Sequence, residues 1–352
     1  MKNCFDITPA SDMTDINGVI TIDRSGYSYN ARIPYTNPKW MSLIDNSIRI
    51  SELSIPGTHG TMARYVDAFP EENLVLNQSL PLADQLNTGI RYIDIRCRHY
   101  NNEFAIHHGF VWQRAYFGDD VLKPVINFLL ENPSETILMR VKEEYDPSGN
   151  TRTFGETFEA YWNPNQAFFW KPTSQNPTLQ DVRGKIILLQ EFTGPNNKMF
   201  GISYNWDLRI QDQWNVVAGP QGIYNKWTAV KNHFYSAMNN KNSIHLNHLS
   251  GSGGQLGGPY PWFIASGYTG RNNNDPSQRI SNSPTDQWPD FPRNATNQVY
   301  YGGMNLLSTR RIRDKRITHT GIIAADFPGA GLIQFTIELN GKFTQKNSIH
   351  HF

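Results

Sequence analysis

The feature that most constrains the fold is the stretch Ile-Pro-Gly-Thr-His at residues 55–59, which puts a histidine directly behind a predicted strand. The apolar run with interleaved polar residues over 50–55 predicts that strand. Pro56 cannot donate a hydrogen bond to a sheet and Gly57 tolerates positive φ, so this pair predicts the end of the strand. His59 then lies on a tight turn at a strand end, where catalytic side chains project in a barrel of parallel strands.

Along the rest of the chain, predicted strands alternate with predicted helices. Apolar or alternating runs predict strands over 91–96, 104–108, 136–142, 184–191, 243–249 and 321–325, and more weakly over 213–217 and 332–339. Helical patterns cover 77–87, 121–131, 154–162, 222–238 and 259–267. This alternation predicts an α/β fold with a mainly parallel sheet. Because some connections are poor in helix, we expect a distorted (β/α)8 TIM-type barrel in a single domain.

Composition shifts divide the chain into two parts, and the second part contains an insertion. Residues 1–40 are polar and rich in turn signals, which predicts an N-terminal extension or cap. Residues 41–352 are predicted to form the barrel, since a barrel with insertions can hold a chain of this length. Residues 271–298 are rich in Asn, Pro and Ser and lack periodicity, which predicts a surface-loop insertion.

Composition also excludes several functional classes. The formal net charge is +1 and the basic residues are scattered, which argues against a nucleic-acid partner. No apolar run approaches the length of a transmembrane segment. Cys4 and Cys97 are too few for a zinc site or a disulfide framework. The first residues show no signal-peptide pattern, so we expect either a cytoplasmic protein or the mature form of a secreted one.

Two histidines at predicted strand ends suggest acid–base chemistry. The imidazole pKa lies near neutrality, so one of His59 and His108 can accept a proton while the other gives one. Strand alternation sends His107 to the opposite face from His108, so we expect His107 to be structural. Arg96 lies on the polar face of its strand and could hold a phosphate, and Asp326 could orient a histidine ring. Taken singly, each of these residues also fits an ordinary ion pair or a buried, hydrogen-bonded histidine.

Several motifs occur together in a specific order. They are Leu-Ser-Ile-Pro-Gly-Thr-His at 53–59, Asp-Ile-Arg-Cys-Arg at 94–98, Ile-His-His-Gly at 106–109, Glu-Asn-Pro-Ser-Glu-Thr-Ile-Leu-Met at 131–139 and Asp-Val-Arg-Gly-Lys-Ile-Ile-Leu-Leu at 181–189. In this order and spacing, the chain resembles the X-type catalytic domain of the bacterial phosphatidylinositol-specific phospholipase C family. The family fold is an irregular (β/α) barrel, in agreement with the strand pattern.

The resemblance implies a reaction and a role for each matching residue. Phosphatidylinositol would be cleaved to diacylglycerol and inositol 1,2-cyclic phosphate, without a metal or cofactor. The implied catalytic roles are general base for His59, orientation of that base for Asp326, phosphate binding for Arg96 and general acid for His108. The implied inositol-contacting positions are Lys142, Asp212, Trp214 and Glu191. The resemblance further implies a secreted monomer that meets its substrate at a membrane surface.

The chain departs from the family pattern at two of these positions. Gly60 stands where metal-free relatives often carry an Asp that supports the acid histidine, and Glu191 stands where a second inositol-binding Arg is expected. Glu191 fits a substrate contact or an ion-paired strand end about equally well. Calcium-dependent relatives carry acidic or amide ligands where this chain has Gly60, Arg96 and Lys142. In this chain Arg96 and Lys142 would thus replace a metal with fixed positive charge. One alternative is a metal-dependent phosphodiesterase resembling glycerophosphodiesterases, but the sequence shows no cluster of Glu and Asp around His59 that such chemistry needs. The other is a catalytically silent lipid- or sugar-binding protein, to which Gly60 gives some weight.

Gly60 leads to two local expectations. Another group or an ordered water must hold the far ring nitrogen of His108. Among the side chains, Asp67, Asp84 and Asp94 are candidates, and Asp94 is favoured because it shares the face of Arg96. A Gly60→Asp variant should fold and keep or raise the rate, unless Gly60 requires positive φ.

A final expectation concerns two aromatic residues that follow a glycine-rich loop. Trp262 and Phe263 fit a membrane-facing position at the pocket mouth or a packing role in the barrel.

Overall fold

The computed structural model describes residues 19–20, 24–30, 36–66, 72–254, 258–280 and 287–344. The strands are β1 (Val19–Ile20), β2 (Gly57–Thr58), β3 (Tyr92–Tyr100), β4 (Glu103–His108), β5 (Val111–Tyr116), β6 (Ile137–Glu143), β7 (Ile186–Glu191), β8 (Ile202–Ser203), β9 (Leu208–Gln211), β10 (Ile244–His248), β11 (Arg293–Asn294) and β12 (Ile322–Ala324). The α-helices are α1 (Glu72–Val75), α2 (Leu82–Thr88), α3 (Lys123–Glu131), α4 (Phe154–Asn165), α5 (Leu179–Val182), α6 (Tyr204–Asp207), α7 (Pro220–Asn239), α8 (Pro261–Ser266), α9 (Met304–Arg313) and α10 (Ala330–Glu338).

Eight of these strands run parallel around a barrel that is interrupted at one place. One arc runs β2–β3–β6–β7–β8 and the other runs β9–β10–β12, each with parallel pairing. Parallel bridges from Ile55 to Ile322 and from Thr58 to Ala325 join β2 to β12 and so connect the arcs. Within the described residues, β8 and β9 do not pair, so the barrel is open between them. The expected distorted TIM-type barrel is thus confirmed in an open form.

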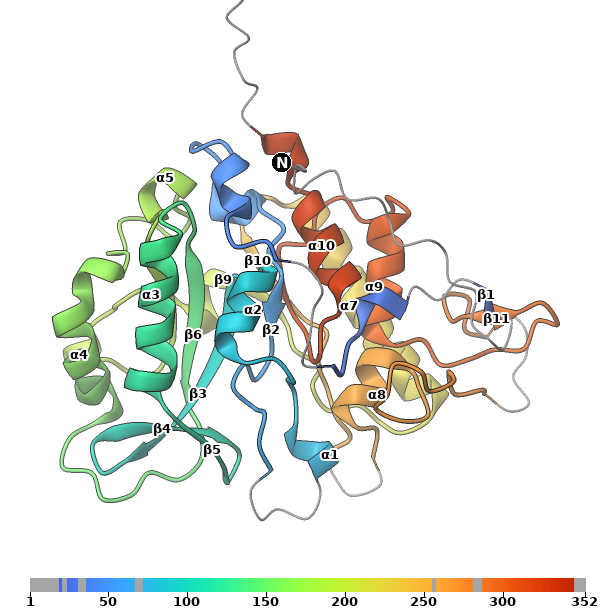
Figure 1. The fold of residues 1–352 in the computed structure, drawn as a ribbon, viewed down its shortest axis with the longest axis horizontal. Helices are drawn as coiled ribbons and strands as arrows, with labels where there is room; N and C mark the ends of the chain where they lie inside the picture. Colours follow the sequence, from blue (N-terminus) through green and yellow to red (C-terminus); the bar gives the residue numbers. More distant parts are fainter. Residues whose placement is uncertain are drawn as a thin grey trace, which may run out of the picture.

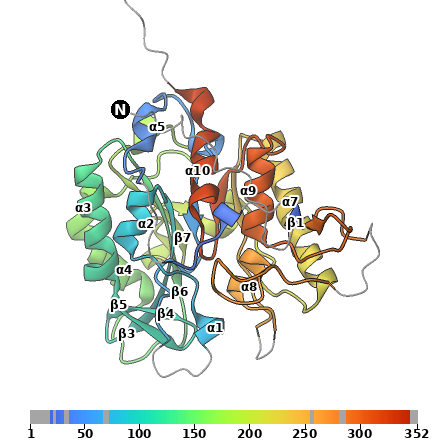
Figure 2. The same cartoon turned by 45° about the vertical axis from the view of Figure 1, so that its right-hand side comes forward.

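Helices cover the barrel on both sides. Helices α3 and α4, drawn in green, lie on one side, and α7, α9 and α10, drawn in yellow to red, lie on the other (Figures 1 and 2). The β4–β5 hairpin extends β3 by antiparallel pairing beyond the barrel. Within the described residues, no helix is both long and apolar enough to cross a lipid bilayer.

Strand register lines up the polar residues that face the barrel interior. Arg96 of β3 is the register partner of Lys142 of β6, and Lys142 is the partner of Glu191 of β7. Two residues earlier, Asp94 is the partner of Arg140. Because side chains alternate along each strand, these residues share one face, while Ile93, Ile95 and their neighbours are buried on the other. The register therefore gathers charge toward the carboxyl ends of the strands.

The strand predicted over residues 50–55 lies later in the chain, at β2. Residues 50–52 form a 3-10 turn, and pairing begins only at Ile55 and continues through Gly57 and Thr58. Gly57 does not make a turn there. A Cβ on Gly57 would lie 2.5 Å from the carbonyl oxygen of Ile323 and 2.6 Å from the Tyr92 side chain, so the glycine allows the close approach of β3 and β12.

Two weaker strand predictions, over 213–217 and 332–339, are wrong. In the first region the strand is β9, because Leu208–Gln211 pairs with β10 while 213–217 makes only an isolated bridge at Asn215. Residues 332–339 lie almost wholly within helix α10, which begins after Gly329. This helix is apolar around its circumference because it packs between two buried clusters, with Ile333 and Ile337 in one and Leu332 in the other.

The helix predicted over 77–87 is shorter than expected. It begins after Pro81 and ends at Gly89, whose φ of 119° permits the left-handed cap. Asn77 is therefore outside the helix, and its side chain is available to the pocket described below.

Candidate active site

All eight site residues predicted from the sequence line one pocket of about 390 Å³. They come from the carboxyl ends of different strands, as a barrel active site requires. The set is His59, Arg96, His108, Lys142, Glu191, Asp212, Trp214 and Asp326. The same pocket is also lined by Asn77 and Arg140, which the sequence did not indicate as site residues.

His59 is held in one tautomer by its neighbours. Its Nδ1 lies 2.8 Å from Oδ1 of Asp326, which is 1% exposed, and the same oxygen accepts a hydrogen bond of 2.9 Å from Nδ2 of Asn77. Its Nε2 lies 2.7 Å from a terminal nitrogen of Arg96. A guanidinium can only donate, so Nε2 carries the lone pair and Nδ1 carries the hydrogen. This is the arrangement that a general base at Nε2 needs.

Arg96 belongs to a buried network of charges. Its Nε donates to Oδ2 of Asp94 at 3.2 Å, and Asp94 Oδ1 accepts from Arg140 at 3.1 Å. Arg140 also donates to Glu191 at 2.7 Å and lies 4.1 Å from the centre of the Tyr204 ring. Burial opposes ionisation of Asp94, but Arg96 and Arg140 outweigh it and hold the pKa of Asp94 well below its usual range. The network keeps the Arg96 side chain in place at the pocket floor.

His108 is supported by the main chain rather than by a carboxylate. Its Nδ1 lies 2.7 Å from the carbonyl oxygen of Val75 in α1 and must donate to it, which leaves Nε2 for the pocket. The favoured candidate, Asp94, is wrong because both of its oxygens are already bonded within the Arg96 network. Asp84, in α2, is not the partner either, because Nδ1 of His108 already bonds to the carbonyl oxygen of Val75. Asp67 lies outside the described residues. Burial, followed by the nearby charge of Arg96, lowers the pKa of His108 to about 4.

His107 lies apart from the pocket. It is 6% exposed, and its ring is stacked on Tyr145 at 6.1 Å with an angle of 6° between the planes. The expected structural placement on the other face of β4 agrees with this position.

Gly60 adopts a conformation that its sequence context left open. Its φ is 48°, and its N–H donates to Asp94 Oδ2 at 3.0 Å. A Cβ here would lie 2.7 Å from Oδ1 of Asn77, the residue that holds Asp326. Gly60 therefore has the positive φ under which Gly60→Asp was not expected to be tolerated. An aspartate at this position would strain the backbone and clash with Asn77.

Glu144 is a further charged residue beside the pocket that the sequence did not indicate. Its Oε1 accepts a hydrogen bond of 2.9 Å from the N–H of Gly109 and lies 3.6 Å from Arg96, and its Oε2 lies 3.6 Å from Lys142. Burial opposes ionisation, but Arg96 and the Gly109 N–H together lower the pKa of Glu144. Its place just beyond the end of β6, two residues after Lys142, is the signal that could have pointed to it.

The aromatic residues near the pocket differ in exposure. Trp214 is 56% exposed at the pocket wall, whereas Trp262 is 8% exposed and stacks on Tyr260. A membrane-facing role for Trp262 is therefore wrong, because α8 turns this side chain into a buried cluster with Tyr27 and Tyr268.

Comparisons with known proteins point to the same family that the sequence motifs resemble. Residues 68–192 match the family described as phosphatidylinositol-specific phospholipase C, X domain. A 1-phosphatidylinositol phosphodiesterase of Listeria monocytogenes is 34% identical over 228 residues, which cover 61% of this chain and 68% of the relative. The chain belongs to the phosphatidylinositol-specific phospholipase C family. A Staphylococcus aureus enzyme of the same name is 28% identical over 267 residues, covering 67% of this chain and 79% of the relative.

The fold of this phospholipase C family member is also that of a solved relative. The phosphatidylinositol-specific phospholipase C of Listeria monocytogenes superposes with a TM-score of 0.65 and 27% identity. The alignment covers 86% of this chain and 98% of the other. The similarity thus extends well beyond the region matched by the family description.

Proposed function

We propose that the protein cleaves phosphatidylinositol to diacylglycerol and inositol 1,2-cyclic phosphate. The observation that carries this proposal is the tautomer of His59, whose Nε2 lone pair faces Arg96 in a pocket also lined by His108. A base, a phosphate-binding guanidinium and a second imidazole in one pocket are the groups that an internal phosphoryl transfer needs.

The proposed reaction begins at the inositol 2-hydroxyl. His59 Nε2 takes the hydroxyl proton as the oxygen attacks phosphorus, and Asp326 stabilises the imidazolium through Nδ1–H. Arg96 offsets the charge that develops on the phosphate oxygens. The bond from phosphorus to the glycerol oxygen breaks, and His108 Nε2 gives that oxygen a proton. Lys142, Asp212, Glu191 and Trp214 are proposed to hold the inositol ring, with Trp214 stacked on its face.

The proposal includes independence from metal ions. In the described residues, no cluster of three or more His, Cys, Asp or Glu side chains is arranged to hold an ion. Arg96 and Lys142 place fixed positive charge in the pocket. This supports the proposal, because their charge can take the place of a calcium ion. The rival metal-dependent phosphodiesterase is distinguished by the effect of a chelator.

A phosphorus NMR time course on phosphatidylinositol vesicles with EDTA tests the function. We expect the cyclic phosphate to appear first and to be hydrolysed slowly. Loss of activity with EDTA and its return with calcium would favour the metal-dependent rival. Binding of the lipid without any product would favour the catalytically silent rival.

Substitution of the histidines tests the roles. His59→Ala and His108→Ala should each lower the rate by at least ~10³ because each removes a proton-transfer group. His107→Ala is the matched control on the same strand as His108 and should retain most of the activity. If His107→Ala were as damaging as His108→Ala, the assignment of the acid would be wrong.

We further propose that the enzyme is a secreted monomer that binds membranes peripherally. The support is the bacterial origin of its relatives and the nature of a substrate held in a bilayer. The proposed domain boundaries remain residues 1–40 for the extension, 41–352 for the barrel and 271–298 for the insertion.

A further inference from the structure

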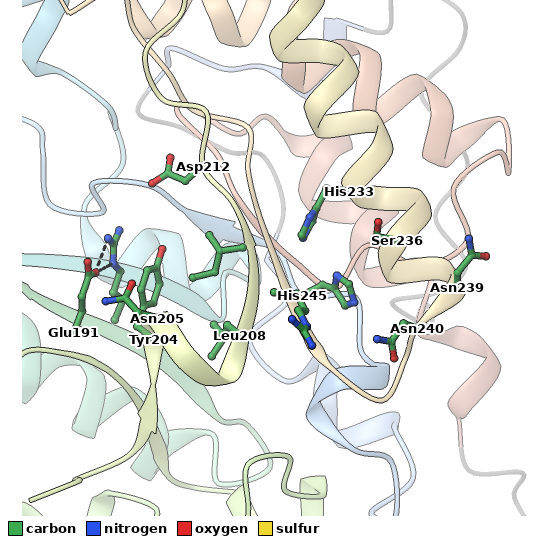
Figure 3. A pocket seen from close by; sticks show the side chains of 13 residues that line it. Glu191, Tyr204, Asn205, Leu208, Asp212, His233, Ser236, Asn239, Asn240 and His245 are labelled. Atoms are coloured by element: carbon green, nitrogen blue, oxygen red, sulfur yellow. Dashed lines mark hydrogen bonds and ion pairs between the residues drawn. The ribbon is translucent and has the colours of Figure 1, made fainter.

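The residues of the catalytic pocket differ in what positions them. Figure 3 shows Glu191 and Asp212 from the neighbouring groove along β9, which they line as well. Glu191 ends β7 and Asp212 directly follows β9, so a strand carries each of them to the pocket. Asp326 lies two residues beyond the end of β12, and Phe327 after it has a backbone φ of 46°. A turn therefore carries Asp326.

Phe327 has a backbone conformation that is unfavourable for a bulky residue. At positive φ the Cβ atom comes too close to a main-chain oxygen, which is why glycine is the usual residue there. Other residues keep such a conformation only where the surrounding contacts impose it, and they gather at functional sites. The contacts around the Phe327 turn therefore determine where the Asp326 carboxylate lies.

Some of these contacts come from the described part of the proposed N-terminal extension. The N–H of Ser28 donates to the carbonyl oxygen of Phe327 at 3.0 Å, and Tyr27 forms an antiparallel bridge with Pro328. The ring centres of Tyr29 and Tyr27 lie 4.8 Å and 6.1 Å from that of Phe327. The extension thus contacts both the main chain and the ring of this turn.

Other contacts come from α9 and from the loop between α1 and α2. The N–H of Phe327 donates to the carbonyl oxygen of Asn77 at 2.9 Å, and Nδ2 of Asn77 donates to Asp326 Oδ1 at 2.9 Å. Nδ2 of Asn305 in α9 donates to the carbonyl oxygen of Asp326 at 2.8 Å. The extension therefore completes a set of contacts that encloses the turn.

The start of the predicted insertion supports the extension in turn. Oδ1 of Asn273 accepts a hydrogen bond of 3.0 Å from the N–H of Tyr29, and its Nδ2 donates to the carbonyl oxygen of Tyr27 at 2.8 Å. The Tyr27 hydroxyl donates to the carbonyl oxygen of Arg271 at 3.0 Å. The two parts of the chain that were predicted to lie outside the barrel thus meet beside the Phe327 turn.

We infer that residues 27–29 are positioning residues, which hold the Phe327 turn so that Asp326 meets Nδ1 of His59. The inference rests on the proposed function, in which Asp326 orients the base. Without these contacts the turn can relax toward negative φ and withdraw the carboxylate from its distance of 2.8 Å to His59. The loss should fall on kcat more than on KM, because Asp326 stabilises a charge that the imidazole gains during the reaction.

Replacement of the closer ring tests the inference. Tyr29→Ala should lower kcat on phosphatidylinositol about tenfold or more with KM nearly unchanged, since a small misplacement near a reacting group strongly lowers the rate. Tyr29→Phe keeps the ring and should recover most of the rate. Tyr224→Ala is the matched control, because Tyr224 is also half-buried and packs on a phenylalanine, Phe291, at 5.2 Å, but does not line the pocket. It should keep the wild-type kcat.

A double-mutant cycle separates positioning from general destabilisation. In the Asp326→Ala background the orienting carboxylate is absent, so the addition of Tyr29→Ala should lower kcat by less than about twofold. If the two losses multiplied instead, Tyr29 would act by a route other than Asp326, and the inference would be overturned. Equal kcat losses in Tyr29→Ala and Tyr224→Ala would also overturn it.

Proton NMR provides a readout that needs no turnover and no Asp326 variant. The hydrogen on Nδ1 of His59, bonded to a carboxylate, should resonate downfield of the amide protons and be absent from His59→Ala. We expect this resonance in the wild type and in Tyr224→Ala, and its upfield shift or loss in Tyr29→Ala. An unchanged resonance in Tyr29→Ala would overturn the inference. If the wild type did not cleave phosphatidylinositol but the resonance moved in Tyr29→Ala, the proposed function would fail and the positioning would stand.

Discussion

At the scale of single residues, the two pocket histidines have different hydrogen-bond partners: a carboxylate for His59 and a main-chain carbonyl for His108. Burial and Arg96 lower the pKa of His108 to about 4, so its acidic form is scarce at neutral pH in the free enzyme. We expect kcat/KM on phosphatidylinositol to be highest on the acidic side of neutrality and to fall roughly tenfold per pH unit as the pH rises to about 8. A pH profile checks this.

The same profile on a nitrophenyl phosphodiester supplies the control for His108. That leaving group departs without a proton, so the alkaline fall should be much weaker. An equal fall on both substrates would mean that another group is the acid.

Gly60 gives a second prediction at this scale. Gly60 and Gly109 both have positive φ, 48° and 55°, but a Cβ on Gly109 would meet nothing within 4 Å. Gly109→Ala should therefore cost only the backbone strain of about 1–2 kcal/mol. Gly60→Ala should cost more and should lower kcat, because its Cβ displaces Asn77 from Asp326.

Denaturant unfolding and kcat of these two alanine variants, together with Gly60→Asp, measure the effect. Equal losses in Gly60→Ala and Gly109→Ala would show that the contact with Asn77 is unimportant. A Gly60→Asp enzyme with wild-type stability and an undiminished rate would contradict the prediction that a side chain at residue 60 strains the backbone and displaces Asn77.

At the scale of elements, the β4–β5 hairpin links His108, the proposed acid, to exposed aromatic side chains. His108 ends β4, and Phe110 at the turn is 56% exposed, with Trp112 at 38% and Tyr145 at 46% nearby. Such side chains favour the headgroup level of a bilayer. We therefore expect Phe110→Ser to weaken binding to phosphatidylinositol vesicles severalfold while leaving activity on soluble inositol cyclic phosphate unchanged.

Vesicle sedimentation with a second variant controls this prediction. Leu130 is 62% exposed on α3, away from the hairpin, so Leu130→Ser should bind vesicles normally. If both variants lost vesicle binding equally, the hairpin would not be the contact.

At the scale of the whole molecule, several histidines are held neutral by burial. The pKa is lowered to about 4 for His108 and His233 and to about 3 for His248 and His319, in each case mainly by burial. Between about pH 6.5 and pH 4 the unfolded chain therefore binds more protons than the folded chain. Stability should fall as the pH falls through this window, by up to about 1.4 kcal/mol per pH unit for each histidine.

Urea unfolding at several pH values measures this slope. His319→Gln removes one titrating group away from the pocket and should reduce the slope. Stability that is constant from pH 6.5 to pH 4 would contradict the account.

Much of the site could be predicted because its residues occupy positions that local sequence patterns identify. Alternation along 91–96 put Asp94 and Arg96 on one face, and positions behind strand ends marked His59, His108 and Asp326. Parallel strands bring such positions to one edge of the sheet whatever the details of packing.

The sequence by itself thus determined the fold class and the positions of His59, Arg96, His108 and Asp326, and its family resemblance added Lys142, Asp212, Trp214 and Glu191, which share the same pocket. Only the tertiary structure decided what supports His108, because a main-chain carbonyl such as that of Val75 has no signature in the sequence. The same holds for Gly57 and Gly60, where one glycine permits close packing of strands and the other a positive φ. The opening between β8 and β9, too, depends on which strands pair. That is settled by long-range packing and not by any local run of residues.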